Sequence, residues 1–128
     1  MDSYHLERFL EAQESSYAQA LSEIQAGRKE SHWIWYIFPQ LVGLGYSHNA
    51  VYYGIRGVEE AQAYLEHPVL GPRLIEITRA LLKHKNQDIE QMLGSIDAMK
   101  CRSCMELFQG LPGADPVFGE VLNHFYVA

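Results

Sequence analysis

The stretch SYHLERFLEAQESSYAQALSEIQA, residues 3–26, sets the expected fold class of this 128-residue chain. Its apolar residues recur every three or four positions, which places them on one stripe of a helix. These residues are Leu6, Phe9, Leu10, Tyr17, Leu21 and Ile24. The acidic residues fall mostly elsewhere and are interpreted as a solvated face, and Gly27 supplies a left-handed stop just after the stretch. The pattern predicts one long amphipathic helix.

The same spacing recurs along the rest of the chain. Ser47 and Asp115 stand where a helix N-cap is expected, and Pro116 suits a first helical position. No internal repeat, low-complexity tract or linker interrupts the pattern. The further helices are expected over residues 47–55, 58–66, 69–85, 88–93 and 97–109, and after Asp115. The sequence therefore predicts an all-α, compact single domain over residues 1–128, with about five to seven helices.

Composition excludes several classes of protein. Apolar residues make up 48% of the chain, which suits a globular core, but no apolar run approaches the roughly 20 residues that cross a bilayer. Acidic residues at the N-terminus stand where a secretory signal is basic, and two cysteines make no disulfide framework, so a cytoplasmic protein is expected. A net charge of −6 argues against binding to a nucleic-acid backbone.

The segment SHWIWYIFPQ, residues 31–40, is unusually rich in aromatic and polar side chains and holds both tryptophans. A tryptophan offers an N–H that needs a partner when buried, and a ring that stacks on flat ligands. His32 can act as an acid or base near neutral pH, and Gln40 both donates and accepts. Periodicity does not decide between a buried strand and a buried helical turn here. An aromatic core and a ligand site both remain consistent with this composition.

Three other features carry candidate chemistry. Lys100 and Ser103 lie one helical turn apart, so they could hold a phosphate or carboxylate, or form a solvated surface pair. Tyr52 follows a glycine-containing loop and could rim a pocket, as could its neighbours Tyr46, His48 and Tyr53. Cys101 and Cys104 form a CxxC inside a predicted helix with no second pair of ligands, so they are interpreted as packing residues and no metal site is predicted.

Three blocks of the chain resemble one known family. Residues 31–40 contain the pattern His-Trp-x-Trp-x-x-Phe-Pro-Gln, and residues 60–74 and 97–108 fit two further blocks. Over nearly its whole length the chain is similar to the bacterial domain of unknown function 1810, sometimes mislabelled as calpastatin. The resemblance implies a small multihelical single domain and a set of site residues, but no reaction.

The resemblance points to His32, Trp33, Trp35, Pro39 and Gln40 in the first block and to Lys100 and Ser103 in the third. Polar residues from separate blocks are expected to meet in one cleft. The chain departs from the family pattern at Cys101, Cys104 and Glu106. It also stops where relatives usually continue, which puts in doubt any part of a site that such a tail supplies.

Two functions from different classes follow as hypotheses. The first is a pocket for an anionic small molecule, such as a nucleotide or phosphorylated metabolite, with no cofactor or metal and with His32 as the one candidate acid or base. Its ligand-binding residues would be His32, Trp33, Trp35, Gln40, Tyr52, Lys100 and Ser103. The second is a non-catalytic protein-interaction module with the aromatic cluster as its hot spot. Whether the protein is an enzyme, and its oligomeric state, stay open.

Overall fold

Five helices of nine or more residues carry the fold, and three short helices connect them. The computed structural model describes residues 3–126, and within that range it contains eight helices and no strand. The long helices are α1 (Glu7–Gln25), α4 (Val58–Glu66), α5 (Leu70–Leu82), α7 (Ser95–Gln109) and α8 (Val117–Phe125). The short ones are α2 (Ile34–Ile37), α3 (His48–Tyr52) and α6 (Ile89–Leu93). The predicted all-α class is confirmed, and the expected five to seven helices become eight when every short turn is counted.

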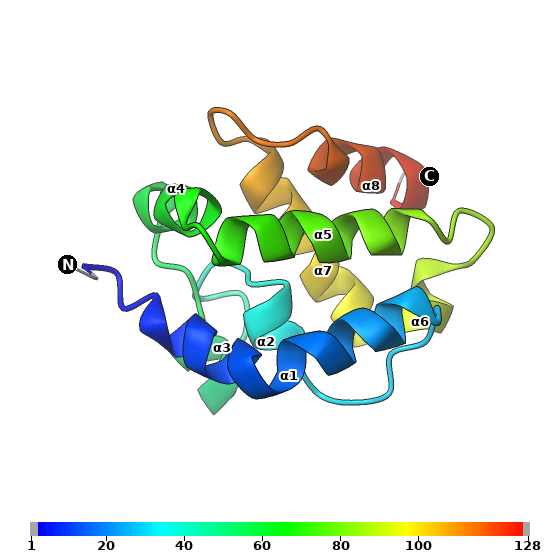
Figure 1. Ribbon diagram of the computed structural model, residues 1–128, viewed down its shortest axis with the longest axis horizontal. Coiled ribbons are helices and arrows are strands. Elements are labelled where there is room, and N and C mark those ends of the chain that lie inside the picture. The colour runs from blue at the N-terminus through cyan, green and yellow to red at the C-terminus, as the bar shows by residue number, and fades with distance from the viewer. Residues whose placement is uncertain (1–2, 127–128) are drawn as a thin grey trace.

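Helix α5 lies at the centre of the molecule. Figure 1 shows it between α1 and α8, with α7 crossing behind it and α4 at one end. Four aromatic rings run through the core from one helix to the next: Phe9 of α1, Tyr64 of α4, Phe108 of α7 and Phe118 of α8. Their centroids are 5.0, 5.5 and 5.9 Å apart in that order, and all four side chains are buried. Each such contact adds about 0.5–1.5 kcal/mol beyond the apolar area that it buries.

The helix starts follow local signals, with one correction, and the helix predicted over residues 47–55 ends early at Tyr52, because Ile55 pairs with residues 40–42. The first helix begins at Glu7 and not at residue 3, because His5 has a φ of 55° and such a left-handed residue cannot continue a helix. Ser47 accepts a hydrogen bond from the backbone N–H of Ala50, and Asp115 accepts one from Val117, as expected of caps. No helix in the described range is both long and apolar enough to cross a bilayer.

The tryptophan-rich segment forms a single helical turn. Helix α2 contains only Ile34–Ile37, and Trp33 precedes it with a φ of −140°. The segment after it, residues 40–42, pairs with Ile55: Ile55 N–H donates to the carbonyl of Gln40 at 2.9 Å, and Val42 N–H donates to Ile55 at 2.9 Å. These two bonds fix the position of Gln40 between α2 and α3.

Gly71, near the start of α5, allows α4 and α5 to approach closely. A Cβ atom at this position would overlap the backbone carbonyl of Leu65, which cannot rotate away. We expect Gly71→Ala to lower the free energy of unfolding by about 3 kcal/mol, as a severe case of overpacking. Gly119 in α8 is the matched control, because its nearest neighbour is a flexible Gln109 side chain at 3.7 Å. Gly119→Ala should raise the free energy of unfolding by about 0.5–1 kcal/mol, because alanine favours a helix more than glycine does. Urea unfolding measures the stability of both variants, and equal changes in the two would show that a Cβ atom at Gly71 does not clash with Leu65.

Candidate functional site

Trp33 is a core residue held by a buried carboxylate. Its ring is buried, and its indole N–H donates to Glu23 Oε1 at 2.9 Å. The same carboxylate accepts hydrogen bonds from the backbone of Glu30 and from both the backbone and the hydroxyl of Ser31. Glu23 is therefore an exception to the predicted solvated acidic face of the first helix, because it is itself buried.

The hydrogen bonds to Glu23 decide its charge. Burial alone would raise the pKa of this carboxyl, but the bonds from Ser31, Glu30 and Trp33 outweigh burial and lower the pKa to about 2. The carboxylate thus stays ionised at neutral pH. Its contribution to stability is present above the ordinary glutamate pKa and is lost as the pH falls toward about 2.

Trp35 lies in a different environment although it belongs to the same motif. Trp33 precedes α2 and bonds to Glu23 of α1, whereas Trp35 lies within α2. The Nε1 atom of Trp35 is buried and has no hydrogen-bond partner among residues 3–126. The Nζ atom of Lys100, on α7, lies 5.2 Å from the centre of the Trp35 ring. The first and third sequence blocks therefore meet at this ring.

A small pit lies beside the Trp35 ring, and we call it the Trp35 pit. Its volume is about 10 Å³, which is room for a single water-sized group. The residues that line it are Trp35, Gln40, Asn49, Ala50, Tyr53 and Gly54. Gln40 is only 8% exposed, and its side-chain amide makes no hydrogen bond to another described residue. The Trp35 pit thus places the Gln40 amide beside a ring whose buried indole N–H has no partner in the described structure.

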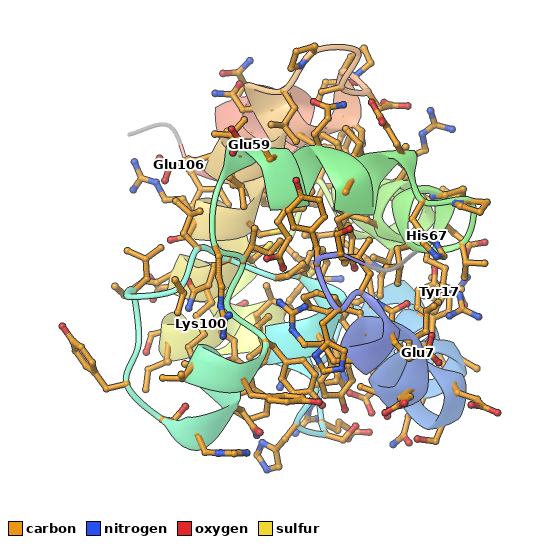
Figure 2. The ribbon with its side chains drawn as sticks, turned by 90° about the vertical axis from the view of Figure 1, so that its left-hand side faces the viewer. Glu7, Tyr17, Glu59, His67, Lys100 and Glu106 are labelled. Atoms are coloured by element: carbon orange, nitrogen blue, oxygen red, sulfur yellow. The ribbon has the colours of Figure 1, made fainter. Side chains whose placement is uncertain are left out.

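The loop of residues 41–47 passes beside the Trp35 pit at Gly45. A Cβ atom at Gly45 would lie 3.0 Å from the Ala50 side chain and 3.9 Å from Gln40 Nε2, so the backbone passes close to both. Apolar side chains on either side of Gly45 point away from the core: Leu44 is 58% exposed and Tyr46 is 92% exposed. Figure 2 shows Lys100 on the side of the molecule that carries α3 and the segment leading to it.

The other predicted site residues lie outside the Trp35 pit. The side chain of His32 is exposed, and its backbone carbonyl accepts from the Tyr36 hydroxyl at 3.4 Å. Ser103 is one turn beyond Lys100 on α7, and its hydroxyl donates to the Met99 carbonyl of its own helix at 3.2 Å. The structure therefore brings Gln40 and Lys100 to Trp35, by way of the pit and the ring respectively. Trp33 and Tyr52 do not line the pit, although the Tyr52 ring packs against that of Tyr53 at 4.8 Å.

Tyr52 lines a larger hollow at the start of α1, with a volume of about 230 Å³. The other residues that line it are Ser3, Tyr4, His5, Arg8, Arg56 and Glu60. Arg8 and Glu60 form a buried ion pair in its wall, with Arg8 Nη2 at 2.6 Å from Glu60 Oε2 and side-chain exposures of 5% and 4%.

The Arg8 guanidinium in the wall of this larger hollow is already fully paired. An arginine has five N–H donors. Those of Arg8 reach five acceptors, namely the backbone carbonyls of Tyr4, His5, Tyr52 and Gly54 and the carboxylate of Glu60. The guanidinium therefore has no donor left for a ligand. The Trp35 pit is smaller, but it is lined by a residue whose buried donor, the Trp35 indole N–H, has no partner in the described structure.

Asn49 is a lining residue that sequence reasoning missed. The aromatic residues around it, Tyr46, His48, Tyr52 and Tyr53, had drawn attention to the segment, and Tyr53 does line the pit. Asn49 carries no motif of its own, and its proximity to Gln40 depends on the pairing of residues 40–42 with Ile55. Arg8 and Glu60 were not predicted as site residues either. The sequence alone does not distinguish a buried ion pair from two separate charges on the surface.

The two cysteines lie in the core, as expected for packing residues. Cys101 and Cys104 are both fully buried on α7. Burial raises the pKa of the Cys101 thiol to about 12 and that of Cys104 well above its ordinary value. Among the described residues, no three His, Cys, Asp or Glu side chains are placed to hold a metal ion.

Comparisons with known proteins agree with the fold and name no activity. A family model described as "Protein of unknown function (DUF1810)" matches residues 3–128. The crystal structure of the conserved hypothetical protein Rv1873 from Mycobacterium tuberculosis aligns with a TM-score of 0.95 and 45% sequence identity. The alignment covers 98% of this chain and 89% of that one. No curated protein matches the chain.

Proposed function

Because the chain belongs to the DUF1810 family of proteins of unknown function, we propose its function from its own geometry: it binds a small anionic molecule at the Trp35 pit. An oxygen of the ligand enters the pit and accepts from the Trp35 indole N–H, and the negative charge lies close to the Lys100 ammonium. The observation that carries the proposal is the buried Nε1 atom of Trp35, which has no partner among residues 3–126.

A buried donor without an acceptor is unfavourable. Leaving an N–H unpaired costs about 1–3 kcal/mol, and native proteins rarely do so. Trp33 provides an internal comparison, because its indole N–H has a carboxylate partner 2.9 Å away. A ligand oxygen in the pit would give Trp35 the kind of partner that Glu23 gives Trp33.

The remaining groups favour an anion. Besides the indole, the pit offers the amide side chains of Gln40 and Asn49, and Lys100 adds a positive charge at the Trp35 ring. These groups supply N–H donors, which suit phosphate or carboxylate oxygens. Nucleotides and phosphorylated metabolites belong to this class, with most of such a ligand lying outside the pit over Lys100 and Ser103. The proposal concerns binding alone, and His32 lies outside the pit and has no role in it.

A thermal-shift panel tests the proposal with inorganic phosphate, adenosine monophosphate, glucose 6-phosphate and phenylacetate. We expect at least one of these anions to raise the melting temperature, because a ligand at about 100 times its Kd stabilises the fold by about 2.7 kcal/mol. Lys100→Gln should remove the shift. Lys83→Gln is the matched control, since Lys83 is an exposed lysine on another helix end.

Two outcomes would count against the proposal. The first is that no anion of the panel changes the melting temperature of the wild-type protein. The second is that Lys100→Gln and Lys83→Gln reduce the shift equally, because the effect would then reflect the overall charge of the protein and not the site.

A protein-interaction role is the second candidate, and the exposure of the loop supports it. Tyr46 is 92% exposed and Leu44 is 58% exposed, and tyrosine is enriched among interface hot spots. We expect a quantitative pull-down with the wild-type protein to enrich a partner that Tyr46→Ser fails to enrich. Exposed Met99, on α7, supplies the control variant Met99→Ser. Equal recovery with the wild-type protein and Tyr46→Ser would argue against this role.

A further inference from the structure

We infer that the group bound in the Trp35 pit is a single carboxylate attached to an apolar body, and not a phosphate. This inference rests on the proposed function, since it names the chemical class of the ligand at the same site. Three features support it: the charge around the pit, the size of the pit and the exposed apolar side chains of the loop beside it.

The charge around the pit matches one negative charge. None of the six residues that line it carries a charged side chain, and Lys100 is the one cation placed at the Trp35 ring among the described residues. A carboxylate carries one negative charge, whereas a phosphate monoester carries about 1.5–2 at neutral pH. The protein as a whole has a net charge of −6, which further disfavours a second negative charge.

The size of the pit also favours a carboxylate. A volume of about 10 Å³ admits one oxygen. A planar carboxylate can place one oxygen in the pit and leave the second outside, near Lys100. A tetrahedral phosphate would bring further oxygens against the rim, where Ala50, Gly54 and the Tyr53 ring offer mostly apolar surface.

The loop beside the pit provides exposed apolar surface for the rest of the ligand. A Cβ atom at Gly45 would lie 3.0 Å from the Ala50 side chain, and the side chains on either side of Gly45, Leu44 and Tyr46, are strongly exposed. An apolar body attached to the carboxylate would cover them as its charged end enters the pit. Burial of such surface is favourable, at about 25 cal/mol for each Å² removed from water.

Titration by ¹⁵N–¹H NMR tests the inference, because the two indole N–H signals report on Trp35 and Trp33 separately. The probes are phenylacetate, phenyl phosphate and phenylacetamide, which share a ring and differ in the polar group. Trp35→Phe identifies the two signals by removing one of them. We expect phenylacetate to move the Trp35 signal and leave the Trp33 signal in place, since Trp33 already donates to Glu23.

The affinities should follow the polar group. Phenylacetate should bind at least about tenfold more tightly than phenyl phosphate or phenylacetamide, and Lys100→Gln should weaken it by about tenfold, as for a lost charged hydrogen bond. Lys83→Gln should leave its affinity unchanged, and Tyr46→Ser should weaken it by about threefold through lost apolar contact.

A peptide arm separates two sources of the carboxylate, by comparing acetyl-Ala-Ala-Phe with its C-terminal amide. Tighter binding of the free-acid peptide than of phenylacetate identifies a peptide C-terminus, and the reverse order identifies a free organic acid.

Failure of the inference differs from failure of the proposed function. If phenyl phosphate moves the Trp35 signal at lower concentration than phenylacetate does, the carboxylate assignment is overturned and anion binding stands. If phenylacetamide binds as tightly as phenylacetate, the requirement for charge is overturned. If none of the probes, nor inorganic phosphate, moves the Trp35 signal, both the inference and the proposed function fail.

Discussion

Arg8→Ala is expected to lower the free energy of unfolding by about 3–5 kcal/mol, because it leaves a buried carboxylate without its partner. The Arg8 side chain is 5% exposed and that of Glu60 is 4% exposed, so water cannot replace the guanidinium easily. The substitution also removes the donors to four backbone carbonyls, two just before α1 and two at or just after the end of α3. Since domains of this kind are stable by about 5–15 kcal/mol, a large part of the stability would be lost.

Glu60→Gln is the matched variant for the same pair. A glutamine keeps an oxygen that can accept from Arg8 Nη2, and the four carbonyl bonds of the guanidinium remain. We expect Glu60→Gln to lower the free energy of unfolding by about 1–3 kcal/mol, which is less than the loss expected for Arg8→Ala. Chemical denaturation in urea measures both variants. An Arg8→Ala protein as stable as the wild type would show that the ion pair and its carbonyl bonds contribute nothing to the fold.

Trp33→Ala carries the second large expected effect, a loss of about 3–5 kcal/mol in the free energy of unfolding. The Trp33 ring is 1% exposed, so its removal leaves a cavity. The substitution also removes one of the hydrogen bonds that keep the buried Glu23 carboxylate ionised. Urea unfolding of the purified variant measures the loss, and circular dichroism shows whether the variant retains its helices.

Trp35→Phe is the contrasting variant, and it separates stability from binding. It keeps most of the ring but removes an N–H that has no partner in the described structure. We expect the free energy of unfolding to change by less than about 1 kcal/mol, or to rise, because an unsatisfied buried donor is removed. The same variant should lose the anion-induced thermal shift. A large loss of stability in Trp35→Phe would indicate that its N–H has a structural partner and that the site is part of the core.

Much of the fold could be predicted because helix signals are local. Apolar spacing located every long helix, and the Ser47 and Asp115 side chains accept the cap hydrogen bonds expected of them. The start of α1 was the exception, because the left-handed His5 leaves no trace in a pattern of apolar residues. Helical spacing measures which face of a segment is apolar, and it says little about the residue at which the chain first turns.

The candidate site was predictable only in part. Sequence blocks pointed to Trp35, Gln40 and Lys100, and the structure does place these three together. They pointed equally to His32, which stays exposed outside the pit. The glycine-containing loop pointed to Tyr52, which lines another hollow. A motif marks residues that lie close in sequence, whereas a pit depends on which side chains the packing of α2, α3 and α7 turns toward one another.

By itself, the sequence determined that this protein is an all-α domain with its two tryptophans in one short motif. Only the tertiary structure decided that Trp33 is a core residue and that Trp35 lines a small pit. The local pattern cannot distinguish them, because both are tryptophans two residues apart in one short aromatic motif. The difference comes from partners elsewhere in the chain: Glu23 of α1 reaches the Trp33 N–H, and Lys100 of α7 reaches the Trp35 ring, whose N–H is left unpaired.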